Sequence, residues 1–173
     1  NNPYLSKFDA DANFIWARSW GGPGSVHSQG MALDDLENSY ITGHFSGSTV
    51  DLDPGPDEAN FPLVGVNDVY LNKIDADGNY VWGLTWGGPE PDICEDVRLD
   101  SSGHVCISGF YNDTADFDPG PGVENRTADL QDIFLNKLDT DGNFIWVRTW
   151  GGTGSDDGVG IAFDNLDYPY LAG

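Results

Sequence analysis

The chain has 173 residues, of which 39% are apolar and 13% aromatic, a composition typical of one globular domain with a hydrophobic core. Its 29 Asp and Glu residues against 7 Lys and Arg give a net charge of −22, which repels nucleic acid and anionic membranes and favours bound cations. No apolar run is long enough to span a bilayer, and no charged and then apolar segment opens the sequence, so any signal peptide is removed or lies outside these residues. We therefore expect neither nucleic-acid binding nor membrane insertion.

A hairpin pattern with a fixed turn begins each of three repeats. Its first strand is short and rich in β-branched and aromatic residues, as in 69–74 and 133–138. The turn Asp-x-Asp-Gly-Asn follows, in which Gly78 and Gly142 supply the positive φ that closes a bulged hairpin. Ala12 stands at this position in the first copy, so we expect a strained or reshaped turn there. The motif also begins like an EF-hand calcium loop, but it lacks the later bidentate glutamate, which favours a plain turn.

The second strand of each hairpin carries all six tryptophans of the chain, which share one face of the strand. The second tryptophan falls at Trp20, Trp86 and Trp150, so the repeat is 66 and then 64 residues long, which indicates a repeat architecture. The opposite face is also apolar, and we expect these strands to pack on both sides, with the tryptophans between neighbouring repeats. A sugar-binding aromatic platform is the alternative.

A second hairpin completes each repeat, and no segment shows the 3.6-residue apolar period of a helix. The paired segments are 30–34 with 39–43, 96–100 with 104–109, and 160–164 with 168–173. Each repeat therefore holds four short strands. If the strands that flank residues 100–103 pair, Cys94 and Cys106 lie near each other but not directly opposite, and both a disulfide and two buried thiols remain open.

An acidic insertion, Asp-x-Asp-Pro-Gly, occurs twice between the second hairpin of one repeat and the first hairpin of the next. The alternate spacing aims both carboxylates the same way, and the carbonyls of a Pro-Gly turn are good ligands for a hard cation. We therefore predict calcium at these loops, with a purely structural turn as the alternative. The predicted ligands are Asp51 and Asp53, Asp116 and Asp118, and, just before the next strand, Asp68 and Asp132.

Several motifs in a fixed order resemble the SBBP type of β-propeller repeat, in its long Asp-Pro-Gly variant. They are Trp-Gly-Gly, Gly-x-x-x-Asp followed by Gly-x-x-Tyr-x-x-Gly, and Phe-Asp-Pro-Gly-Pro-Gly before a strand that ends in Lys-Leu-Asp. The resemblance covers essentially the whole chain. It implies an all-β fold of four-stranded antiparallel propeller blades, about 64–66 residues each. It also implies a bacterial secreted or cell-surface protein.

By similarity to related propellers, the tryptophan strand is outermost and the chain enters at the third strand of a blade. The implied division is 1–22 as an outer hairpin, 23–88 and 89–152 as blades with an Asp-Pro-Gly loop each, and 153–173 as an inner hairpin. Since a propeller needs at least four blades, these are too few to close a ring alone. Either further blades of a longer chain or other copies of this chain pair with the end hairpins, in a ring or a filament.

In a propeller, the loop between the second and third strands emerges on the same face as the connection between blades. This places further acids near the Asp-Pro-Gly loops: Glu90, Asp92, Glu95 and Asp96 after one blade, and Asp156 and Asp157 after the next. They are additional candidates for a shared cation site.

No catalytic constellation stands apart from the repeat. His27, His44 and His104 occupy non-equivalent places without metal-ligand spacing, and we expect them to be structural or surface residues. The sequence therefore predicts a non-enzymatic, calcium-stabilised, extracellular structural or adhesive propeller module. The alternative is a carbohydrate-binding propeller with glycans as partners, whereas a propeller hydrolase has no supporting motif.

Overall fold

The structure is a computed structural model that describes residues 2–158 and 160–173, so residues 1 and 159 of the predicted ranges 1–22 and 153–173 lie outside it. Every regular element in the described part of the chain is a β-strand, and all the sheets are antiparallel. This confirms the predicted all-β class.

Two four-stranded sheets form the middle of the molecule. The first has the order β3 (Val26–Leu33), β4 (Ser39–Phe45), β7 (Asp68–Ile74) and β8 (Tyr80–Trp86). The second has the order β9 (Ile93–Leu99), β10 (Val105–Asp116), β11 (Asn125–Leu138) and β12 (Phe144–Trp150). In both sheets the tryptophan strand lies at one edge, as expected for a propeller blade.

Three two-stranded sheets accompany these blades. They are β1 (Tyr4–Phe8) with β2 (Phe14–Ser19), β5 (Thr49–Asp51) with β6 (Asn60–Pro62), and β13 (Gly160–Phe163) with β14 (Pro169–Ala172). The pair β5 and β6 is the hairpin of the first Asp-Pro-Gly insertion. In the second insertion, β10 and β11 continue past their main ladder and pair again at its far end, after a register shift.

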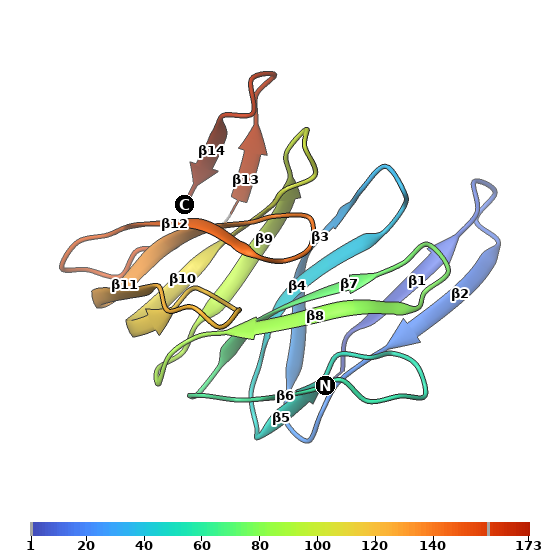
Figure 1. Cartoon of the computed structure of the whole chain (residues 1–173), viewed down its shortest axis with the longest axis horizontal. Helices are drawn as coiled ribbons and strands as arrows, with labels where there is room; N and C mark the ends of the chain where they lie inside the picture. The colour runs from blue at the N-terminus through green and yellow to red at the C-terminus, as the bar shows by residue number, and fades with distance from the viewer. Residues whose placement is uncertain (1, 159) are drawn as a thin grey trace.

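Figure 1 shows the sheets in chain order, with the β1–β2 hairpin on one side of the molecule and the β13–β14 hairpin on the other. Strand β9 contacts β3 and β4 of the preceding blade and β13 of the following hairpin, so the blades meet through their first strands. The described strands form incomplete propeller-type blades and close no ring. The exact blade limits at residues 22, 88 and 152 stay a prediction.

Six of the hairpin turns in the described chain share one design. In each, an aspartate Oδ1 accepts hydrogen bonds from the backbone N–H groups two and four residues later, which is the Asx-turn chemistry of aspartate. The residue three after the aspartate has a positive φ in all six, as at Gly78 (83°) and Gly142 (86°). The first turn keeps this shape with Ala12 at φ 61°, so the predicted strain is present at Ala12. The six aspartates are Asp9, Asp34, Asp75, Asp100, Asp139 and Asp164.

The hydrophobic core lies mainly between neighbouring sheets. Trp86 belongs to a cluster of buried residues drawn from both blades, which includes Leu71 of the first and Phe134 of the second. Trp20 packs in the same way with Val26 of the following blade. These contacts confirm that Trp20 and Trp86 lie between repeats.

Cys94 and Cys106 are both buried free thiols on neighbouring strands, and neither is directly opposite the other. The Sγ of Cys94 donates to the Gly43 carbonyl at 2.9 Å and accepts from Thr42 Oγ1 at 3.0 Å. Burial raises the pKa of both thiols to about 12, so they remain protonated and unreactive at neutral pH.

Candidate functional site

The backbone of each Asp-Pro-Gly insertion lies against the Trp-Gly-Gly motif of the preceding repeat. Gly21 exchanges two backbone hydrogen bonds with Asp51, with N···O distances of 3.0 and 2.7 Å. A Cβ at Gly22 would overlap the carbonyl oxygen of Thr49, and a Cβ at Gly88 would overlap that of Thr114. The glycines therefore recur because the backbone of the following insertion lies directly on them.

The Asp-Pro-Gly loops use their own carboxylates to fix the turn. Asp51 Oδ1 accepts from the N–H groups of Asp53 (3.0 Å) and Ala59 (2.9 Å), and Asp53 Oδ1 accepts from Gly55 (2.6 Å). The second loop repeats this arrangement: Asp116 Oδ1 accepts from Asp118 and Glu124, and Asp118 Oδ1 accepts from Gly120. One oxygen of each predicted ligand thus orders its own loop.

The other two predicted ligands, Asp68 and Asp132, lie apart from those turns, in pairs with acids that follow the Trp-Gly-Gly motif. Asp68 and Asp92 are 1% and 2% exposed. Asp68 Oδ1 and Asp92 Oδ2 each lie 2.8 Å from the point that a Cβ at Gly87 would occupy, so both carboxylates face the same small space. Asp92 Oδ2 accepts from the N–H of Gly88 at 2.5 Å, and Asp68 Oδ2 accepts from Val64 at 2.7 Å.

A related arrangement recurs one repeat later, where Asp132 and Asp156, both half-buried, lie by Gly151 and Gly152. Asp132 Oδ1 faces the Cβ position of Gly151, and Asp156 Oδ2 accepts from the N–H of Gly152 at 3.0 Å. The backbone also links the members of each pair. The N–H of Asp92 donates to the carbonyl of Asn67, the residue before Asp68, at 2.9 Å, and the N–H of Asp156 donates to the carbonyl of Gln131, the residue before Asp132, at 2.8 Å.

Asp68, Asp92 and Asp132 have raised pKa values. Burial raises the pKa of Asp68, and it raises the pKa of Asp92 to about 7, with a smaller contribution from the charge on Asp68. For Asp132, burial is again the main cause, followed by repulsion from Asp156. A charge on both members of a pair is therefore unfavourable unless a cation balances it.

The first repeat has no such pair. Asn2 and Val26 stand at the positions equivalent to Asp68 and Asp92, and the amide group of Asn2 faces the Cβ position of Gly21. Both acids are thus absent together from the first of the three repeats.

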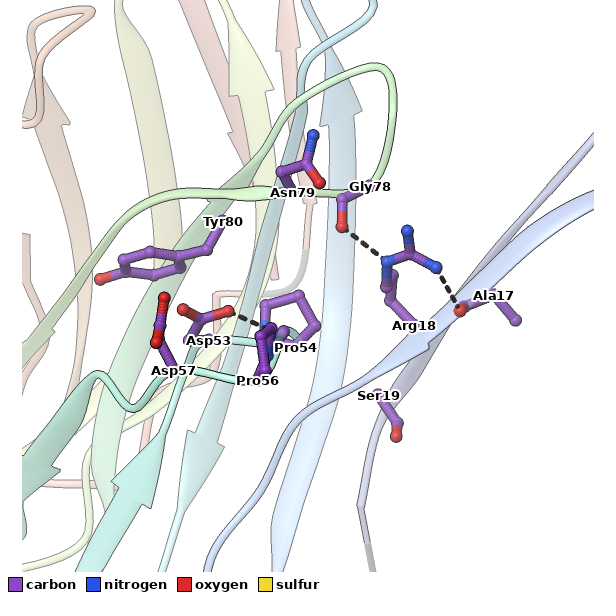
Figure 2. A pocket seen from close by; sticks show the side chains of 11 residues that line it. Ala17, Arg18, Ser19, Asp53, Pro54, Pro56, Asp57, Gly78, Asn79 and Tyr80 are labelled. Carbon is purple, nitrogen blue, oxygen red and sulfur yellow. Dashed lines mark hydrogen bonds between the residues drawn. The ribbon is translucent and has the colours of Figure 1, made fainter.

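An open groove of about 620 Å³ lies between the β1–β2 hairpin, the first Asp-Pro-Gly loop and the turn between β7 and β8. Figure 2 shows the residues that line it. The ring of Tyr80 lies along it beside the carboxylates of Asp53 and Asp57. On the other side, Arg18 Nε donates to the Gly78 carbonyl at 2.8 Å. The groove joins an aromatic ring with charged and amide groups, a combination that suits a polar ligand.

Most of the tryptophans are too buried to form the sugar-binding aromatic platform that the sequence left open as an alternative. Trp20 and Trp86 are buried, and Trp16, Trp82 and Trp146 are half-buried, with Trp16 Nε1 donating to the Ala76 carbonyl at 3.3 Å. Only Trp150 is exposed among the six. Sequence reasoning therefore missed the Tyr80 groove, which depends on an insertion and a turn from separate parts of the chain.

The histidines and metal-ligating groups gather in pairs at most. The rings of His27 and His44 stack with centroids 5.0 Å apart, and burial together with His27 lowers the pKa of His44 to about 4. Within residues 2–158 and 160–173, no three His, Cys, Asp or Glu side chains lie close enough to hold a metal ion by themselves. The described residues also include no helix able to span a bilayer.

An ion pair inside the second blade involves Asp100. Its Oδ2 lies 2.6 Å from Lys137 Nζ and 3.0 Å from His104 Nδ1. Burial acts to raise the pKa of Asp100, but the hydrogen bonds from Lys137 and His104 outweigh it and lower the pKa to about 2. Asp100 is therefore ionised through the neutral range, and this cluster stabilises the blade.

No family model matches the chain. A curated relative, an uncharacterized WD repeat-containing protein of Acanthamoeba polyphaga mimivirus, is 30% identical over 117 residues. The alignment covers 58% of this chain and 8% of that protein, so the chain spans a small part of the relative's length. WD repeats are propeller repeats of four-stranded blades, which agrees with the sheets found here. The comparison supports a propeller-type repeat and does not extend to the SBBP family.

Proposed function

We propose that this chain is a non-enzymatic structural or adhesive propeller module that joins further blades of its own kind by completing their sheets. The observation that supports it is a contrast in exposure between equivalent positions. Tyr70 and Tyr40 are 0% and 1% exposed inside a blade, whereas their equivalents Tyr4 in β1 and Tyr170 in β14 are 75% and 62% exposed. The end hairpins thus carry core residues without the strands that bury them elsewhere.

The proposal specifies a register. Tyr40 pairs with Lys73 in one blade and Cys106 pairs with Lys137 in the other. By repeat equivalence, a blade made from β13 and β14 of one chain with β1 and β2 of another pairs Tyr170 with Lys7. Edge strands with free N–H and C=O groups favour this kind of addition.

The partner in this proposal is another copy of the chain or a further blade of a longer one. Similarity to a WD repeat-containing protein supports a general role in protein interaction, since such repeats form stable surfaces for partners. Three more specific parts of the proposal rest on the sequence motifs and on the net charge of −22. They are membership of the SBBP family, bound calcium and a bacterial extracellular location.

Crosslinking tests the register directly. The double variant Lys7→Cys with Tyr170→Cys should form disulfide-linked dimers and larger species under mild oxidation, because directly opposite residues satisfy disulfide geometry. Ser6→Cys with Tyr170→Cys is the matched control, one residue out of register, and should crosslink poorly. Static light scattering should show concentration-dependent association, and a monomer at every concentration would rule out assembly from copies of this chain.

The Tyr80 groove favours one second candidate, a carbohydrate-binding propeller. Sugars bind to sites that combine an aromatic face with carboxylate and amide hydrogen-bonding groups, and Tyr80, Asp57 and Asn79 line this groove. A glycan array should then give a signal that Tyr80→Ala abolishes. The exposed Tyr168, distant in sequence from the groove, supplies the control variant Tyr168→Ala, which should leave that signal unchanged.

A further inference from the structure

Among the residues that the structure describes, no cationic side chain forms an ion pair with the buried Asp68 and Asp92. Asp68 Oδ1 is also buried without any hydrogen-bond partner in the described part of the chain, although it faces Asp92 across the space at Gly87. Burying an unpaired carboxylate costs on the order of several kcal/mol, so either a proton or a cation must balance the charge of this pair.

The repeat supplies independent support. Asp132 Oδ1 is likewise buried and unpartnered in the described chain, and it faces the same position of the next Trp-Gly-Gly motif. The two acids occur together in the second and third repeats and are absent together from the first, where Asn2 and Val26 replace them. This joint presence and joint absence among the three repeats is what two carboxylates that bind one ligand would give.

We propose that each pair, Asp68 with Asp92 and Asp132 with Asp156, binds one calcium ion beside the Trp-Gly-Gly motif. Carboxylate oxygens are the charged ligands that calcium prefers, and it completes its shell with backbone carbonyls and water. The ion would join the start of the third strand of one blade to the connection that leads into the next. This inference rests on the calcium part of the proposed function and moves the site from the Asp-Pro-Gly turns to the blade junctions.

The test compares three double variants of the full chain with the wild type. Asp92→Asn with Asp156→Asn removes one acid from each pair, and Asp53→Asn with Asp118→Asn removes the turn acids. Asp11→Asn with Asp141→Asn removes two exposed turn acids and is the control for lost charge. The melting temperature of each is measured with calcium and with chelator.

We expect calcium to raise the melting temperature of the wild type, the control and the turn variant, and to leave that of the pair variant unchanged. Terbium, which replaces calcium, gives a second readout because Trp86 and Trp150 stand next to Gly87 and Gly151 and can sensitise its luminescence. The pair variant should lose this luminescence. If the double variant fails to fold, the single variant Asp156→Asn should lose the signal of one site and keep the other.

Two results would overturn the inference. If the pair variant keeps the calcium shift and the turn variant loses it, calcium binds at the Asp-Pro-Gly loops and the proposed function stands without this site. If calcium changes the melting temperature of neither the wild type nor any variant, calcium binds neither at the blade junctions nor at the Asp-Pro-Gly loops. The assembly proposal is still decided by the crosslinking and light-scattering experiments.

Discussion

The middle of the molecule and its two end hairpins carry the same sequence pattern in different surroundings. Phe8 in β1 is 55% exposed, whereas Ile74 at the equivalent position of β7 is fully buried. Trp150 is 48% exposed, whereas Trp86 is 5% exposed below the insertion of the next repeat. The pattern of each repeat therefore encodes contacts with a neighbour, and burial depends on whether that neighbour is present.

The largest expected effect comes from one substitution made at two equivalent tyrosines. Tyr70→Ala should lower the free energy of unfolding by about 3–5 kcal/mol, because it empties a fully buried site. Tyr4→Ala should change it by less than about 0.5 kcal/mol in the isolated monomer, because Tyr4 is exposed. Urea denaturation at low protein concentration measures both, and equal effects would contradict the comparison.

Alanine at the second glycine of Trp-Gly-Gly gives the next largest contrast. Gly88→Ala should destabilise the fold by about 1–3 kcal/mol, since its Cβ would overlap the backbone carbonyl of Thr114. Gly152→Ala should be nearly neutral, because nothing lies within 4 Å of its Cβ position. Thermal unfolding of the two variants checks this, and a large loss at Gly152 would mean that its surface is already covered.

The Asp100 cluster predicts an acid-dependent loss of stability in the second blade. Because the folded pKa of about 2 lies below the ordinary aspartate pKa of 3.8, the contribution of Asp100 is present above about pH 4 and is lost as pH falls towards 2. Asp100→Asn should remove about 1 kcal/mol of this acid dependence. Asp164→Asn, at the same turn position of the last hairpin, is the control and should leave most of the acid dependence of stability unchanged. The measurement is the free energy of unfolding between pH 2 and 6, and identical profiles for both variants would be contrary to this account.

The smallest effect concerns the first turn, where Ala12 stands at the position that Gly78 and Gly142 hold in the equivalent turns of the other repeats. Ala12→Gly should stabilise the first hairpin by about 0.5–1 kcal/mol, because it relieves a positive φ of 61°. Gly78→Ala should destabilise by a similar or larger amount, since φ is 83° there and Arg18 lies 3.0 Å from the Cβ position. Both changes are measured by thermal unfolding, and a destabilising Ala12→Gly would show that the turn is not strained.

The sequence was sufficient for the local structure. Short runs rich in β-branched and aromatic residues and the Asp-x-Asp-Gly-Asn turns predict the strands and their hairpins, because both signals lie within a few neighbouring residues. The tryptophan period also predicts packing between repeats, as Trp86 shows. Strain at Ala12 followed from one missing glycine.

The candidate site depended on contacts that no local pattern records. Asp92 was one of several acids expected near the loops, but only the fold shows that it meets Asp68 at Gly87. The recurrence of Gly22 and Gly88 was visible, whereas its cause, the backbone of the next insertion, was not. Calcium at Asp51, Asp53, Asp116 and Asp118 stays a prediction.

The six Asx turns have a consequence for the order of folding. Each turn is closed by hydrogen bonds within five residues, so a hairpin can form as soon as those residues leave the ribosome. Pairing between hairpins and contact between blades come later and proceed from one repeat to the next, as in other repeat proteins. Synthesis would then extend a growing row of blades, and only the newest edge would await its partner.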